Sequence, residues 1–305
     1  MSPSSIGHYN IPSWIEKNKK YFLPPVCNKM MHGEGQLKVF YVGGPNQRKD
    51  FHLEEGEEFF YQVQGNMNLV VLEGKTFKDV IIKEGEVFQL PGKIPHSPQR
   101  YKDTVGLVIE RERMKSEHDC LRYFVDGTTE SLWERWFYCE DLGTQLGPVI
   151  KEFFASEQHK TGKPIPGTIR KDQPWIPDAT RVLQEPFPLA TWLNKHRAEI
   201  QQEGSKRLFD LSYQSDVVVF GCGTSKHSRP GMETWLWQLE GESEVEVGEE
   251  KVSLCPQDSL LVRASTPYTL TRRPNALTLS LVMDTANKDR GFTHLKETLK
   301  KETKE

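Results

Sequence analysis

The chain has 305 residues, and its hydrophobic fraction of 36% and charged fraction of 27% are those of a globular protein. Its 40 basic and 43 acidic residues give a net charge of -3 without a basic stripe, which disfavours nucleic acid or an anionic membrane as a partner. No stretch approaches the roughly 20 apolar residues of a membrane span, and the start of the chain has no apolar signal segment. We therefore expect a cytosolic protein that acts on a small molecule.

The cysteines indicate a reduced environment. They are odd in number and have no paired spacing, which argues against a disulfide framework. They are Cys27, Cys120, Cys139, Cys222 and Cys255. We expect reduced thiols at all five positions.

Short β-rich runs between glycines and prolines fill the first half of the chain. The runs are LKVFYV, EFFYQVQG, MNLVVL, DVIIK, EVFQLP and VGLVIE. No long 3.6-residue period intervenes, so this half is typical of an antiparallel sandwich or barrel.

The middle of the chain changes character. From about Cys120 to Pro188 the sequence becomes richer in helix-like segments, namely SLWERWFYCEDLG and PVIKEFFASEQHK. Prolines and charges then follow in GKPIPGTIRKDQPWIPD, which suggests a connecting element. We expect a partly helical linker here.

β-rich runs return in the last part of the chain, as DVVVFGCG, TWLWQLEGESEVEVG, DSLLVRAS and ALTLSLVMD. The charged tail HLKETLKKETKE is low in complexity, and we expect it to be frayed.

The two β-rich halves resemble each other. Aligning Gly65 with Gly241 gives both halves the same order of strands and turns. The polar positions differ, because this alignment sets Ser228, Thr234 and Tyr268 against the first half's two histidines and a glutamate. His227 lies one residue away, and a one-residue step along a strand turns a side chain to the opposite face. We therefore expect two similar barrels, of which only the first holds a metal.

Three residues of the first half form the polar constellation. His52 is followed after five residues by Glu58, and His96 follows Pro91 after four residues. Two imidazoles and a carboxylate can hold a divalent metal on one face and leave other positions open. Either histidine alone is more simply a buried histidine that lines a barrel.

This spacing resembles the two short motifs of the cupin superfamily, which are small jelly-roll barrels. The usual earlier histidine of the first motif is absent, since Asp50 stands two residues before His52. The resemblance implies an all-β dominated chain with two cupin domains joined by a partly helical linker. We expect a catalytic domain at residues 1–160, a linker at 161–177 and a degenerate second domain at 178–305.

Residue parity extends the constellation. Residues two apart on a strand share a face, so we expect Arg48 beside His52, and Pro98 and Arg100 beside His96. Glu110 places a carboxylate in the otherwise apolar run VGLVIE. Each has a plainer explanation at a barrel rim or in a charged run. Together they indicate a pocket that presents a small acid to a metal.

Several longer stretches resemble the 3-hydroxyanthranilate 3,4-dioxygenase family. They are LPPVCNKMM, VGGPNQRKDFH, EEFFYQVQGNMNL, LPGKIPHSPQR and LVIER. The resemblance covers most of residues 8–160, and its combination of motifs is specific.

The family resemblance implies a role for each matching residue. It makes His52, Glu58 and His96 the ligands of one Fe(II) per chain. It places Arg48 and Arg100 on the substrate carboxylate and Glu110 at the substrate hydroxyl and amino groups, as the base for the hydroxyl proton. It also puts three residues around the substrate; these are Asn28, Val26 and Pro98.

Members with a single barrel carry two C-x-x-C pairs that bind a second iron. Here the first pair is reduced to Cys139 and Leu142, and SEQHKTGKPIPG contains no cysteine. Four thiolates would be needed for that tetrahedral site, so we expect no second metal. The additional barrel matches the animal-type enzymes, in which a fused domain replaces a partner subunit. We therefore expect a monomer.

The resemblance implies a dioxygenase of the kynurenine pathway of tryptophan degradation. Such an enzyme uses O2 to open the ring of 3-hydroxyanthranilate, and the product cyclises to quinolinate, a precursor of NAD. Two alternatives stay open at this point. Another cupin enzyme would keep the metal residues without needing both arginines and Glu110, and a non-catalytic protein with two barrels would tolerate loss of the metal residues.

Overall fold

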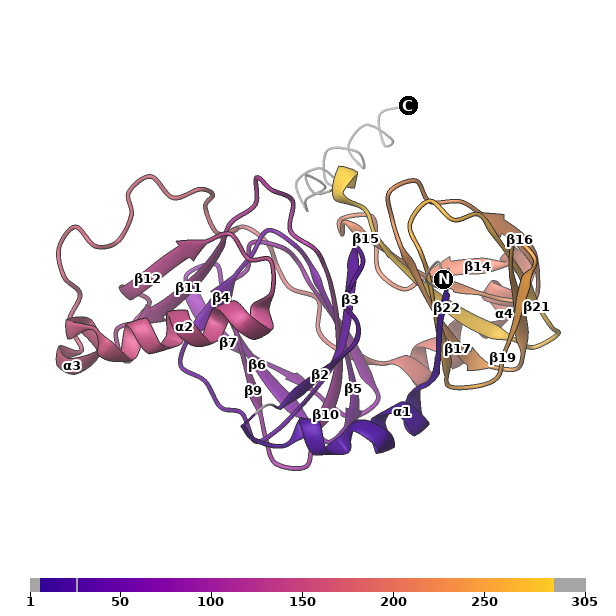
Figure 1. Ribbon diagram of the computed structural model, residues 1–305, viewed down its shortest axis with the longest axis horizontal. Coiled ribbons are helices and arrows are strands. Elements are labelled where there is room, and N and C mark those ends of the chain that lie inside the picture. Colours follow the sequence, from indigo (N-terminus) through magenta and orange to yellow (C-terminus); the bar gives the residue numbers. More distant parts are fainter. Residues whose placement is uncertain (1–5, 26, 288–305) are drawn as a thin grey trace. The chain divides into compact units, whose positions relative to one another are not determined.

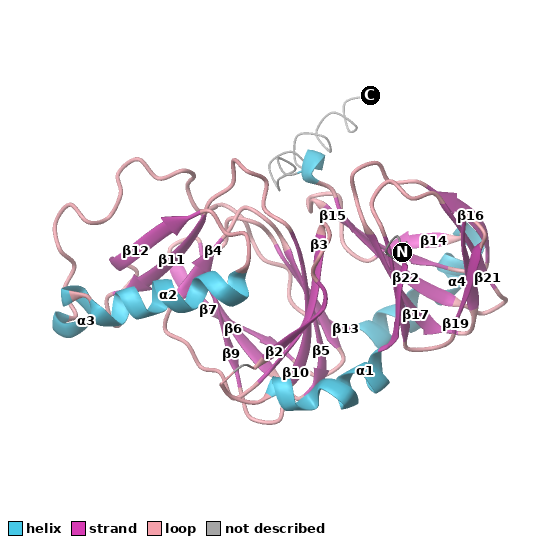
Figure 2. Ribbon diagram, in the orientation of Figure 1, coloured by secondary structure: helices cyan, strands magenta, loops and turns pink. Residues whose placement is uncertain are grey.

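The computed structural model describes residues 6–25 and 27–287, and these are mostly β-strand, drawn in magenta in Figure 2. The chain divides into two compact units. We call residues 43–106 and 112–187 the site unit, and residues 1–42, 107–111 and 188–305 the companion unit. The domain boundaries that the sequence predicts stay a prediction.

The site unit is built on a six-stranded sheet with the order β12-β11-β4-β9-β6-β7. Its strands are β4 (Phe51–Leu53), β6 (Met67–Glu73), β7 (Thr76–Ile82), β9 (His96–Arg100), β11 (Asp119–Phe124) and β12 (Ser131–Phe137). A further antiparallel pair joins β5 (Glu58–Gln64) to β8 (Glu86–Leu90). The predicted strands between residues 58 and 90 are therefore confirmed.

The companion unit contains a six-stranded sheet, β1-β20-β17-β22-β15-β14, and a four-stranded sheet, β16-β21-β18-β19. The first consists of β1 (Ile6–Asn10), β14 (Ser205–Arg207), β15 (Ser215–Phe220), β17 (Thr234–Glu240), β20 (Asp258–Val262) and β22 (Leu277–Met283). The second consists of β16 (Gly223–His227), β18 (Ser243–Val247), β19 (Glu250–Leu254) and β21 (Tyr268–Arg272). Leu236 and Leu260 of one sheet and Val245 and Leu270 of the other share one buried core. We call residues 215–283 the second barrel.

The remaining strands are β2 (Asn28–His32), β3 (Leu37–Gly43), β10 (Val105–Arg111) and β13 (Phe187–Pro188). β2 and β3 form an antiparallel pair. β10 is buried along its whole length, and it contains the predicted strand VGLVIE.

The helices are α1 (Ile11–Asn18), α2 (Leu142–Ala155), α3 (Glu157–Thr161) and α4 (Leu189–Glu203), with short 3-10 turns η1 (Lys19–Phe22) and η2 (Thr285–Asn287). The predicted helical segment PVIKEFFASEQHK is confirmed by α2 and α3, whereas α1 and α4 were not predicted. Within residues 6–25 and 27–287, no helix combines the length and the apolar character needed to cross a membrane.

The prediction of a helix-like segment at SLWERWFYCEDLG is wrong for its first half. Residues 131–137 form β12, which pairs with β11 and lies beside α2 in Figure 1. Across the two strands Arg122 and Glu134 form a buried ion pair of 2.7 Å, and Trp133 packs near Tyr123 and Phe153. Cross-strand partners of this kind stabilise a sheet, and a single segment of sequence does not reveal them.

The proline-rich segment GKPIPGTIRKDQPWIPD forms neither helix nor strand, as predicted. It is nevertheless fixed to the site unit, because Trp175 is buried against Phe51 and Cys120, and its indole N–H donates to the His118 carbonyl at 2.7 Å. The predicted frayed tail lies outside the described residues.

The repeat alignment is confirmed at Gly65 and Gly241, which both have φ of +64°. It is wrong by one residue at Ser228. In the second barrel His227 pairs with Tyr268, as His52 pairs with His96 in the site unit. His227 therefore does not point to the opposite face, and its ring stacks on Tyr268 at 4.9 Å. The segment between His227 and Thr234 is one residue longer than the segment between His52 and Glu58, which displaced the alignment.

His32 makes part of the stability of the companion unit dependent on pH. It is 8% exposed, its ring packs 5.3 Å from that of Tyr9, and its Nε2 has no hydrogen-bond partner among the described residues. Burial, together with the charge of Arg263, lowers the pKa of His32 to about 4. Because the folded pKa lies below the unfolded value, this histidine stabilises the fold above about pH 6.5 and loses that effect as the pH falls towards 4.

We expect the wild type to lose about 2–3 kcal/mol more unfolding free energy than His32→Leu between pH 7.5 and pH 4.5. Leucine cannot titrate, so other acid-sensitive groups cancel in the comparison. Urea unfolding of both proteins at the two pH values measures the difference. Equal losses in the two proteins would contradict a buried neutral His32.

Candidate metal centre

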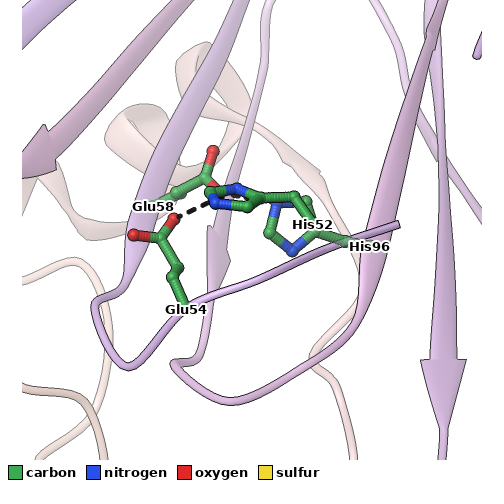
Figure 3. Close-up of side chains that lie close together, drawn as sticks. All are labelled: His52, Glu54, Glu58 and His96. Atoms are coloured by element: carbon green, nitrogen blue, oxygen red, sulfur yellow. Dashed lines mark ion pairs between the residues drawn. The ribbon is translucent and has the colours of Figure 1, made fainter. Parts of the chain in front are cut away.

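Two histidines face each other across neighbouring strands of the site unit. His52 is the central residue of β4, His96 is the first residue of β9, and the two are direct partners in the antiparallel pair. Their ring centroids lie 5.4 Å apart. Residues opposite each other in a sheet share a face, so both rings point to the same side, as Figure 3 shows.

Glu58 is the first residue of β5 and approaches His96 from a different strand. Its Oε1 lies 2.7 Å from Nε2 of His96. The other ring nitrogen of His96, Nδ1, donates to the carbonyl of Ile94 at 2.9 Å, because a carbonyl can only accept. This bond fixes the ring and directs Nε2 towards the carboxylate.

Glu54 is the fourth member of the cluster. One donor atom from each of His52, Glu54, Glu58 and His96 lies within 4.8 Å of the other three, and all four residues are buried. Within the described residues this is the one group of three or more such side chains that could hold a metal ion. Glu54 also has a cationic partner, because its Oε2 lies 2.5 Å from Nη2 of Arg113.

A second carboxylate orients His52 from outside the cluster. Nε2 of His52 lies 2.8 Å from Oδ2 of Asp119, which is fully buried, while Nδ1 points towards Glu54. Arg113 donates to Asp119 from Nε at 3.1 Å and from Nη2 at 2.9 Å. Burial opposes ionisation of Asp119, but Arg113 and His52 outweigh it and lower the pKa of that carboxyl. A carboxylate behind a ligand histidine is a common feature of metal sites.

The donors fit a divalent metal. Two ligands about 2.1 Å from an ion and at right angles to each other lie about 3 Å apart, close to the separation of His96 and Glu58. Burial disfavours the charge on Glu58, but His96 outweighs that effect and holds the pKa of Glu58 well below its usual range. An ionised carboxylate with two imidazoles suits a transition metal with open positions.

Arg100 brings an uncompensated charge to the same region. It is 4% exposed, and no carboxylate lies within 4.0 Å of it in the part of the chain that the structure describes. Burial lowers its pKa to about 10, and the charges of Glu58 and Arg48 act on it from nearby. Gly106 leaves room for Gln62, because a Cβ there would lie 2.6 Å from Oε1 of Gln62, whereas Nη1 of Arg100 would be at an ordinary contact distance of 3.8 Å.

Comparison with known proteins shows the family of this chain. A family model described as 3-hydroxyanthranilic acid dioxygenase matches residues 4–154. The chain is 55% identical over 271 residues to the 3-hydroxyanthranilate 3,4-dioxygenase of Xenopus tropicalis, covering 89% of this chain and 96% of that protein. It is 51% identical over 278 residues to the human enzyme of that name, covering 91% and 96%. The chain belongs to this dioxygenase family.

A solved structure supports the fold. A single-residue mutant of salicylate 1,2-dioxygenase from Pseudoaminobacter salicylatoxidans is 12% identical to this chain and has a TM-score of 0.54. The match covers 91% of this chain and 84% of that one. The predicted fold class, dominated by β-strands and of the cupin type, is confirmed, and so is the prediction of an enzyme of the dioxygenase family.

The structure brings together most of the residues that the sequence singled out. His52, Glu58 and His96 form the cluster, and Arg100 acts on Glu58. Arg48 lies before β4, so the argument from strand parity does not reach it. Its guanidinium pairs with Asp50, donating from Nε at 3.1 Å, and its charge still acts on His96 and Arg100.

Three of the other predicted substrate residues lie on three different strands. Pro98 is half-buried in the middle of β9, Glu110 is 5% exposed in β10, and Asn28 is exposed at the start of β2. Val26 lies outside the described residues. The roles of these four residues stay predictions.

Sequence reasoning missed Glu54, Asp119 and Arg113. Glu54 stands two residues after His52, so the parity argument applied to Arg48 would also have found it. Asp119 and Arg113 follow His52 by more than 60 residues, and no motif spacing connects them to it.

We expect His52→Ala, Glu58→Ala and His96→Ala to lower the bound metal per chain at least tenfold, because each removes one of three donors from a small set. Glu54→Gln is the matched control and should keep most of the metal, since its carboxylate pairs with Arg113. Metal analysis after desalting, with circular dichroism as the test of folding, gives the answer. Normal metal content in Glu58→Ala, or equal loss in Glu54→Gln, would contradict this ligand set.

Asp119→Asn should weaken metal binding by about 10–100-fold, because an amide stabilises the ligand form of His52 less well than a carboxylate. Asp126→Asn changes an exposed side chain and should have no effect. Competition with a chelator measures the affinity of both variants. An affinity of Asp119→Asn equal to the wild type would assign Asp119 to fold stability alone.

Proposed function

We propose that this chain is an Fe(II)-dependent dioxygenase that opens the ring of 3-hydroxyanthranilate with O2. The product is 2-amino-3-carboxymuconate semialdehyde, which contains both oxygen atoms and cyclises to quinolinate with loss of water. The observation that carries this proposal is the buried cluster of His52, Glu58 and His96 beside Arg100, a buried cation without a carboxylate partner among the described residues. One site thus offers ligands for a metal and a partner for a substrate carboxylate.

Each residue has a distinct task in the proposed reaction. His52, Glu58 and His96 would hold one Fe(II) per chain, which would pass electrons from the substrate ring to O2. Arg100 would bind the substrate carboxylate as a two-pronged donor. Arg48 would add a second positive charge, and Asp50, its present partner, holds it in place.

Glu110 is the proposed base for the substrate hydroxyl proton. It is a buried carboxyl group in a strand that is buried along its whole length, and a carboxylate can accept a proton. Asn28, Val26 and Pro98 would surround the ring. We also propose that the protein is a cytosolic monomer whose second barrel needs no metal.

The direct test adds 3-hydroxyanthranilate to the Fe(II)-loaded protein in air and follows the near-ultraviolet absorbance of the conjugated product. Uptake of one O2 per substrate should accompany it. Anthranilate, which lacks the hydroxyl group, should not react. Folded, iron-loaded protein without turnover would favour another cupin activity or a non-catalytic binding protein.

Substitutions of Arg100 and of Glu110 should change different kinetic constants. Arg100→Met should raise KM about 30-fold or more, because removing one side of a buried charge pair typically costs about 2–5 kcal/mol. Glu110→Gln should instead lower kcat about 100-fold or more with a small change in KM. Steady-state kinetics separates the two effects, and Lys102→Ala, an exposed neighbour of Arg100, is the control. A change in KM alone for Glu110→Gln would make that residue structural.

A further inference from the structure

The second barrel repeats the register of the metal centre. His227 pairs with Tyr268 as His52 pairs with His96, and the two rings stack at 4.9 Å. Thr234 opens β17 as Glu58 opens β5. The strands therefore place a comparable set of side chains at an equivalent position.

The negative charges of the metal centre are missing at this equivalent position. Counted from the paired histidines, Ser225 stands where the site unit has Asp50, and Arg229 stands where it has Glu54. Thr234 replaces the third carboxylate. A set with one imidazole, three hydroxyls and an added cation cannot bind a metal ion as the first cluster does.

Two polar residues of the first site are retained. Arg272 follows Tyr268 by four residues, as Arg100 follows His96, and each is the last residue of its strand. Gln238 donates to the carbonyl of Glu240 at 2.8 Å, just as Gln62 donates to that of Gln64. The second barrel has thus lost the metal-binding carboxylates while keeping the arginine.

Arg272 is a buried cation without a counter-charge in the described part of the chain. It is 6% exposed, and its Nη1 donates to Ser225 Oγ at 2.8 Å and to the Leu270 carbonyl at 3.0 Å. Its Nε donates to the Gly221 carbonyl. Throughout residues 6–25 and 27–287, no carboxylate lies within ion-pair distance of it. Burying an unpaired charge is energetically unfavourable, so an anion that pairs with Arg272 would lower this free-energy cost.

One aromatic ring lies beside this guanidinium, and two more rings continue from it. The ring of Phe220 lies 5.3 Å from Cζ of Arg272 and 5.4 Å from the ring of His227, which in turn stacks on Tyr268. The charge of Arg229 acts on both His227 and Tyr268, so a second cation faces the same rings. Flat apolar faces beside a guanidinium fork suit a planar ring that carries a carboxylate.

We propose that the second barrel binds a small aromatic carboxylate at Arg272 without a metal. The carboxylate would pair with Arg272 and the ring would lie against Phe220 and the stacked pair of His227 and Tyr268. This site is separate from the metal centre and does not depend on the reaction proposed for it.

The test is calorimetric titration of the full-length, metal-loaded chain with benzoate. In Arg100→Gln, which weakens carboxylate binding at the metal centre, about one benzoate per chain should still bind. Adding Arg272→Gln should weaken that binding at least tenfold. Adding Arg273→Gln is the matched control, because this neighbouring arginine is exposed and pairs with Glu242 at the surface. It should leave binding unchanged.

Two further measurements keep a folding defect apart from a lost site. Arg272→Lys keeps the charge but loses the fork, and should bind benzoate with intermediate affinity and a normal circular dichroism spectrum. Phe220→Leu should weaken benzoate but not cyclohexanecarboxylate, which has no aromatic face.

Three results would overturn the proposal. Loss of all benzoate binding in Arg100→Gln alone would leave no second site. An equal loss of binding in Arg273→Gln and Arg272→Gln would remove the assignment to Arg272. Binding of phosphate or cyclohexanecarboxylate as tight as that of benzoate would refute the aromatic carboxylate as the ligand class.

Discussion

The pairing of β4 with β9 is the constraint on which the metal centre depends. It sets His52 directly opposite His96, and only this register turns both rings to one face. A slip of one residue would bring Leu53 or Phe51 into the place of His52 and remove the imidazole from the cluster. Glu58 comes from another strand, so the ligand set also requires that β5 begin at that residue. The neighbouring strand β11 holds β4 in this register, with Leu121 opposite His52, and also supplies Asp119 behind that histidine.

In the part of the chain that the structure describes, most buried charges beside the cluster lie in ion pairs. Glu58 lies against His96, Asp119 against His52 and Arg113, and Arg48 against Asp50. Because an unpaired charge in a protein interior is unfavourable, each pair also fixes the position of its members. Arg100 differs, because no carboxylate among the described residues lies within ion-pair distance of it, and Glu58 acts on it only from further away. In the proposed reaction, a substrate carboxylate would pair with Arg100 and complete the set.

The sequence predicted the strands, and it singled out three of the four clustered residues, because both depend on short spacing. Alternation identifies a strand, and the two motifs fix His52, Glu58 and His96 within 45 residues of one another. Prediction from the sequence failed where the interacting residues are far apart in the chain. Residues 131–137 become a strand through their pairing with β11, and Asp119 reaches His52 only in the folded chain. The repeat alignment failed at Ser228 because one added loop residue shifts the count while the strand register, set by hydrogen bonds, stays the same.

The second barrel shows that this fold forms without the carboxylates of the metal centre. It keeps the strand order, the register at His227 and Tyr268, and the glutamine and arginine that follow, yet it has none of the carboxylates of the metal centre. Its core is closed instead by apolar side chains such as Leu236, Val245 and Leu270. A barrel of this type therefore reaches its fold by strand pairing and core packing, without metal ligands. The same physics applies to the site unit, where β4 pairs with β9 at His52 and His96 and where Leu53, Leu69 and Val71 are fully buried.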